Sequence, residues 1–119
     1  MPSILLIEDD PDMADAVQGM LRALGHEVTF AENGQVALQR IRAGFRPGLV
    51  LTDIVMPELH GIEVVQILGA QLTDTPIVAM SALKDTPYLR TAQLLGASEI
   101  LAKPFTLQQL HQALDRALS

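Results

Sequence analysis

The fold is decided by the stretch Leu49-Val50-Leu51-Thr52-Asp53-Ile54-Val55-Met56-Pro57, an apolar run that carries one carboxylate and turns at a proline. A run of this length bounded by turn residues is typical of a strand buried on both faces of a sheet. Asp53 would then lie at the carboxyl end of that strand, which is where open α/β sheets bind ligands. A carboxylate among apolar residues is costly unless another group pairs with it, so we expect partners from elsewhere in the chain.

The composition indicates one globular domain, residues 1–119, with 49% apolar and 18% charged residues. Eight Lys and Arg against 14 Asp and Glu give a net charge of −6. This balance argues against a protein that binds phosphate backbones, so we expect no direct contact with nucleic acid. The absence of cysteine excludes disulfides, thiolate metal sites and thiol catalysis.

No stretch of the sequence is typical of an export signal or a membrane helix. The first apolar run, Ile4–Ile7, has no basic residues before it and stops at three acids. No segment approaches the ~18 apolar residues that a membrane helix needs. We therefore expect a cytoplasmic protein without a membrane partner.

Strand-like and helix-like patterns alternate along the chain. The strands are predicted at Ser3–Ile7, His26–Ala31, Leu49–Asp53, Ile77–Ser81 and Ser98–Ala102. Helices are predicted from Pro11 to Leu24, after Asn33-Gly34, after Gly61, from Pro87 to Leu95, and over Leu107–Leu118. Five strands alternating with five helices predict an α/β fold, in which a parallel sheet carries helices on both faces.

Polar side chains stand where four of these strands stop: Glu8 and Asp9 after the first, Asp53 after the third, Ser81 after the fourth and Lys103 after the fifth. In a right-handed parallel sheet these ends share one edge, so three carboxylates, a hydroxyl and an amine should converge. Crowded carboxylates repel one another unless a hard cation joins them, and Mg²⁺ prefers such oxygen ligands. The amine and the hydroxyl could then hold phosphoryl oxygens.

Two nearby acids have a simpler interpretation. Asp10 precedes Pro11 and is predicted to be the N-cap of the first helix, with the proline at the first helical position. Asp12 is then a first-turn acid favoured by the helix dipole.

The chain resembles the receiver domains of two-component response regulators over essentially its whole length. The resemblance rests on four motifs in order: Ile4-Leu5-Leu6-Ile7-Glu8-Asp9-Asp10-Pro11, Leu51-Thr52-Asp53-Ile54-Val55-Met56-Pro57 with Gly61, Ala79-Met80-Ser81-Ala82, and Leu101-Ala102-Lys103-Pro104-Phe105. It implies a flavodoxin-like, doubly wound five-stranded sheet of strand order 2-1-3-4-5, and a cis Lys103-Pro104 bond.

The resemblance also implies a function. Asp53 would be the phosphoacceptor, receiving a phosphoryl group from a sensor histidine kinase or a phosphotransfer protein. Mg²⁺ would be held by Glu8, Asp9, Asp53 and the backbone carbonyl of Val55. The protein would be no enzyme acting on a separate substrate, although it would catalyse its own phosphorylation and dephosphorylation.

In such domains the hydroxyl at Ser81 and the amine of Lys103 contact the phosphoryl group. Phosphorylation rearranges the face made by the fourth helix, fifth strand and fifth helix, which binds a downstream protein. A homodimer through the last two helices stays open, although the sequence shows no exposed apolar patch that supports it.

Two departures from the family pattern, at Glu8 and Ile100, bear on these expectations, and two apolar residues beside the site suggest a further hypothesis. Glu8 stands where Asp is frequent, so its longer side chain could reach a metal through water. Ile100 stands where many members carry an aromatic residue that turns inward on activation, and an aliphatic side chain cannot report activation by the same rotation. The apolar Val55 and Leu83 flank the site, and we hypothesise that they restrict the attack of water on the phosphorylated state.

Two other functions remain open from the sequence. The chain could be a receiver-like interaction module that signals without phosphate, which Glu8 and Ile100 would favour. It could instead be a Mg²⁺-dependent phosphohydrolase of the haloacid dehalogenase type, with Asp10-Pro11-Asp12 as the nucleophile motif. A dinucleotide-binding fold is disfavoured, because acids follow the first strand where a glycine-rich loop should stand.

Overall fold

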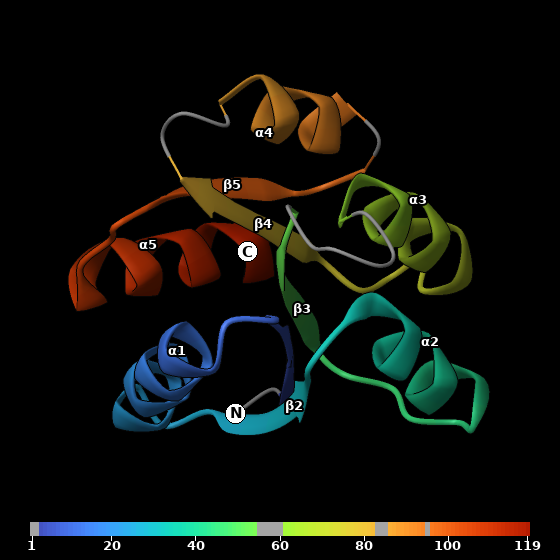
Figure 1. Cartoon of the computed structure of the whole chain (residues 1–119), viewed down its shortest axis with the longest axis horizontal. Helices are drawn as coiled ribbons and strands as arrows, with labels where there is room; N and C mark the ends of the chain where they lie inside the picture. The colour runs from blue at the N-terminus through green and yellow to red at the C-terminus, as the bar shows by residue number, and fades with distance from the viewer. Residues whose placement is uncertain (1–2, 55–60, 83–85, 95) are drawn as a thin grey trace.

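The computed structural model describes residues 3–54, 61–82, 86–94 and 96–119, which form a five-stranded sheet between two layers of helices (Figure 1). The strands are β1 (Ser3–Ile7), β2 (Glu27–Ala31), β3 (Leu49–Asp53), β4 (Ile77–Ala82) and β5 (Glu99–Lys103). The helices are α1 (Pro11–Ala23), α2 (Gly34–Arg42), α3 (Gly61–Gln71), α4 (Thr86–Leu94) and α5 (Leu107–Leu118). Strand and helix alternate as the sequence predicts.

All neighbouring strands are parallel, in the order β2-β1-β3-β4-β5. This arrangement confirms the predicted doubly wound α/β fold. From β1 the chain moves outward to β2 and then returns to β3 on the other side of β1, so the winding direction reverses between β1 and β3. Ligands of such sheets bind in the crevice at this point, beyond the carboxyl ends of the strands.

Two apolar cores fill the space between the sheet and its helices. One core lies under α1 and α5, and the other lies under α2, α3 and α4 (Figure 1). Successive side chains of β3 point to opposite faces, so Leu49 and Leu51 join the first core and Val50 joins the second. Every residue of β3 is buried, which explains the unbroken apolar run in the sequence.

The start of α1 is as predicted. Asp10 is the N-cap, and its Oδ1 accepts a hydrogen bond of 3.0 Å from the backbone N–H of Asp12, while Pro11 occupies the first turn. Gly25 follows the helix with a φ of 88°, a conformation in which a side chain would be strained. The cap and the glycine mark the two ends of α1, and the cap places the start of the helix directly after the acidic segment that follows β1.

Two strands were predicted to end one residue too early. β4 continues to Ala82 and β5 to Lys103, because the ladder between them includes the pairs Ser81↔Ala102 and Ala82↔Lys103. Ser81 and Lys103 are therefore held by strand pairing instead of by the loops that follow. Within the described part of the chain, none of the helices has the length and apolar content to cross a membrane.

Candidate functional site

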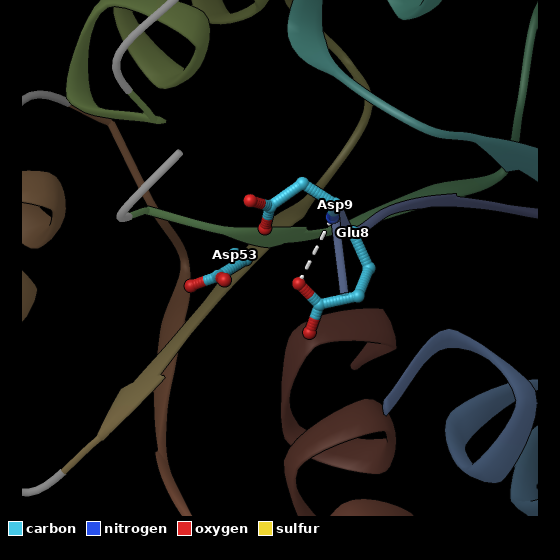
Figure 2. Close-up of side chains that lie close together, drawn as sticks. All are labelled: Glu8, Asp9 and Asp53. Carbon is cyan, nitrogen blue, oxygen red and sulfur yellow. Dashed lines mark hydrogen bonds between the residues drawn. The ribbon is translucent and has the colours of Figure 1, made fainter. Parts of the chain in front are cut away.

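Three carboxylates meet at the carboxyl ends of β1 and β3. The last pair of the ladder between these strands is Ile7↔Thr52, so Glu8 and Asp53 follow it at the same level of the sheet. Oxygen atoms of Glu8, Asp9 and Asp53, one from each residue, lie within 4.8 Å of one another (Figure 2). Glu8 is fully buried and Asp53 is 6% exposed, whereas Asp9 is open to solvent. The cluster therefore has two buried acids and one accessible acid.

Lys103 brings a positive charge to this cluster from the edge strand β5. Its Nζ lies 2.8 Å from Oε1 of Glu8 and 3.3 Å from Oδ2 of Asp53. Only β4 separates β5 from β3, so the long side chain spans the width of one strand. The Lys103-Pro104 peptide bond is cis, as the family resemblance implies. The amine offsets part of the negative charge that burial would otherwise make costly.

Glu8 uses both carboxylate oxygens. Oε1 accepts a hydrogen bond from Lys103. Oε2 accepts one of 3.1 Å from the backbone N–H of Asp9, which is the dashed line in Figure 2. Burial raises the pKa of the Glu8 carboxyl from 4.5 to about 7; the hydrogen bond from Lys103 lowers that pKa, while the charge of Asp53 raises it. Glu8 therefore exchanges its proton near neutral pH.

Lys103 stays protonated in the same range. Burial by itself lowers the pKa of its amine, but the hydrogen bond to Glu8 and the negative charge of Asp53 outweigh burial and hold the pKa above the usual 10.5. The site thus contains one permanent positive charge beside an acid whose charge depends on pH.

Ser81 belongs to the same edge of the sheet. It follows Met80, which pairs with Asp53, and it pairs with Ala102, which precedes Lys103. Its side chain is buried, with 1% exposed. The register therefore puts Ser81 on the strand between Asp53 and Lys103. Val55, whose carbonyl is a predicted metal ligand, and Leu83, its predicted apolar companion, lie outside the described residues.

The donor set fits a hard divalent cation. Three carboxylates offer oxygen atoms close together, and the accessible position of Asp9 leaves one side of the cluster facing solvent. Mg²⁺ favours a small number of carboxylates together with waters and phosphate oxygens. The arrangement can therefore gather a cation and an anionic group beside a carboxylate that can act as a nucleophile.

One polar residue next to this site, Thr52, was not predicted from the sequence. Thr52 is fully buried in β3, and its Oγ1 donates a hydrogen bond of 2.8 Å to the backbone carbonyl of Asp53. The available signal was a hydroxyl inside an otherwise apolar run.

Ile100, the predicted departure from the family pattern, lies on β5 opposite Ala79 of β4. Its half-buried side chain packs against the core under α2, α3 and α4. An aliphatic side chain that already packs there has no ring to rotate inward. The effect of Ile100 on the coupling between the site and the output face stays a prediction.

Comparison with known proteins gives matches over nearly the whole chain. A family model described as the response regulator receiver domain matches residues 4–115. The transcriptional regulatory protein CrdR of Helicobacter pylori is 38% identical over 114 residues, which cover 95% of this chain and 53% of CrdR. The transcriptional regulatory protein FixJ of Bradyrhizobium diazoefficiens is 34% identical over 115 residues, which cover 97% of this chain and 56% of FixJ.

The chain thus spans about half the length of these curated relatives. Among solved structures, the chemotaxis response regulator CheY4 of Vibrio cholerae is similar with a TM-score of 0.89 and 28% identity, over 99% of both chains. Because some relatives are transcriptional regulators by name, the expectation of no direct nucleic-acid contact stays a prediction.

Proposed function

The chain belongs to the response regulator receiver family, and on that premise we propose that it accepts a phosphoryl group on Asp53 in a Mg²⁺-dependent reaction. The donor would be a sensor histidine kinase or a phosphotransfer protein in the cytoplasm. The observation that carries the proposal is the Asp53 carboxylate, which lies 3.3 Å from Lys103 and beside the oxygens of Glu8 and Asp9. Residues 1–119 would act as one receiver domain.

Asp53 acts as the nucleophile. A carboxylate oxygen attacks the phosphorus of a phosphohistidine, a P–O bond forms, the P–N bond breaks, and the imidazole leaves with the bonding electron pair. Such transfers need little covalent chemistry from the protein, so alignment of the two reactants accounts for most of the rate. Burial of Asp53 at the end of a rigid central strand supports this role, because it restricts the directions in which the carboxylate can point.

Glu8, Asp9 and Asp53 would hold the metal ion, together with the backbone carbonyl of Val55. When bound, Mg²⁺ supplies positive charge that stabilises the oxygens of the transferring group. The three side chains bring their oxygens within 4.8 Å of one another without the metal, which supports this assignment. Glu8 would act as a ligand directly, after losing its proton, or through water.

Lys103 and Ser81 would contact the phosphoryl group once it is on Asp53. The Lys103 amine is already 3.3 Å from Oδ2 of Asp53 and can neutralise an added phosphoryl oxygen. Ser81 can donate a hydrogen bond to a second oxygen. Movement of Ser81 toward that oxygen would shift the equilibrium between two conformations of the face formed by α4, β5 and α5. This face would bind the downstream protein.

The hydrolase alternative places the nucleophile on Asp10. In the structure the Oδ1 of Asp10 caps α1 by accepting from the backbone of Asp12 and Met13, and Asp10 is not part of the carboxylate cluster. We therefore favour Asp53 as the phosphorylated residue.

Intact mass measured after incubation with a small acyl phosphate and Mg²⁺ tests the proposal. We expect a gain of one phosphoryl group that a chelator or Asp53→Asn abolishes. Asp12→Asn, which changes an exposed acid outside the cluster, should leave the gain intact. A phosphoryl group that persists in Asp53→Asn would contradict the proposal. No gain in a protein that binds Mg²⁺ would favour the receiver-like module that signals without phosphate.

A further inference from the structure

Thr52 is a buried hydroxyl in an apolar environment. It pairs with Ile7 of β1 on one side and with Ala79 of β4 on the other, and all three residues are fully buried. Because side chains alternate along a strand, Thr52 faces the α2, α3 and α4 core, on the opposite side of the sheet from Asp53. Its hydroxyl therefore lies away from the carboxylate cluster and acts on the site through the backbone.

The hydrogen bond from Thr52 replaces one that the sheet no longer supplies. In a parallel ladder continued past Ile7↔Thr52, the backbone N–H of Asp9 would donate to the carbonyl of Asp53. That N–H donates instead to Oε2 of Glu8, at 3.1 Å. The Oγ1 of Thr52 donates to the Asp53 carbonyl at 2.8 Å.

We propose that Thr52 is a positioning residue, whose hydroxyl fixes the peptide that follows Asp53 and thereby aims the Asp53 carboxylate at Lys103 and the cluster. This inference rests on the proposed function of Asp53. Strand pairing fixes Asp53 from the β4 side through the pair Asp53↔Met80. The hydroxyl supplies the restraint on the other side, at the point where the ladder to β1 has ended.

Two variants separate positioning from packing. Thr52→Val keeps the shape of the side chain and removes the hydroxyl, whereas Thr52→Ser keeps the hydroxyl and removes a buried methyl group. A purely structural role would make the rate of phosphorylation follow the melting temperature in both variants. A positioning role makes the phosphorylation rate and the melting temperature diverge. Thr52→Ser then has the lower melting temperature, and Thr52→Val has the lower phosphorylation rate.

Phosphorylation by a small acyl phosphate with Mg²⁺ is followed by intact mass, and melting by circular dichroism. We expect Thr52→Val to lose about 3- to 10-fold in rate, the effect of one neutral hydrogen bond. Thr52→Ser should stay within about 2-fold of the wild type in spite of its lower melting temperature. A wild-type rate in Thr52→Val, or rates that follow melting temperature in both variants, would overturn the inference.

A structural readout keeps this test independent of phosphate transfer. We expect the NMR signal of the Asp53 carboxyl carbon, recorded at one pH in chelator, to shift in Thr52→Val and to keep its position in Thr52→Ser. An unchanged signal in Thr52→Val overturns the positioning role. A wild type that takes no phosphate while the signal shifts as expected would overturn the proposed function and support the positioning role of Thr52.

Discussion

Glu8 should make the metal-free protein lose stability as the pH rises toward neutrality. Its buried carboxyl has a pKa of about 7 in the folded protein against an ordinary value of 4.5. The folded protein therefore binds this proton more tightly than the unfolded chain does. The stability that this tighter proton binding contributes is fully present below pH 4.5 and is lost as the pH rises through about 7. A pKa change of this size corresponds to at most about 3 kcal/mol of unfolding free energy.

Lys103 adds nothing to the pH dependence of the unfolding free energy in this range, because its pKa is raised above 10.5 and it keeps its charge. Urea unfolding in chelator between about pH 5 and about pH 8 measures the effect. We expect the free energy of unfolding of the wild type to fall relative to that of Glu8→Gln, which has no proton to exchange at this position.

Glu27→Gln, a change of an exposed glutamate, is the matched control and should keep the wild-type slope. Gln cannot accept hydrogen bonds with both terminal atoms, so Glu8→Gln should also differ from the wild type by an offset that does not depend on pH. A difference between wild type and Glu8→Gln that stays constant across the whole range would refute the reasoning.

Three further changes have defined outcomes. Mg²⁺ at ten times its dissociation constant should stabilise the wild type by about 1.4 kcal/mol in thermal unfolding. Asp9→Asn removes the accessible ligand of the cluster, so it should weaken that stabilisation at the same Mg²⁺ concentration. Leu51→Ala should cost about 2–5 kcal/mol in urea unfolding, because Leu51 is fully buried in the α1 and α5 core; a loss below 1 kcal/mol would mean that the core collapses around the gap. Thr106→Ala should cost about 1 kcal/mol and Thr106→Ser much less, because Thr106 and Gln109 form a capping box at the start of α5; equal losses in circular dichroism melts would contradict this role of the hydroxyl.

The order of strands and helices followed from the sequence because each element carries its own local signal. The run around Leu49–Asp53 lacks polar alternation since both faces of β3 are covered. Asp10 and Pro11 marked the start of α1 through the chemistry of helix caps, which involves neighbouring residues alone. The ends of β4 and β5 were predicted too early, because pairing between two distant strands, and not a local signal, decides where a strand stops.

The sequence by itself determined that acids, a hydroxyl and a lysine stand at the ends of strands, and parallel winding then requires them to share one edge. Only the tertiary structure decided their contacts. Lys103 and Glu8 are 95 positions apart in the chain, and the register of the three strand pairs from β1 to β5 sets the 2.8 Å between them. Two other features depend on where the β1–β3 ladder ends. They are the burial that raises the pKa of Glu8 and the hydrogen bond from Thr52 to the Asp53 carbonyl. Register is fixed by the packing of both cores against the sheet, a property of all the strands together that no single stretch of sequence contains.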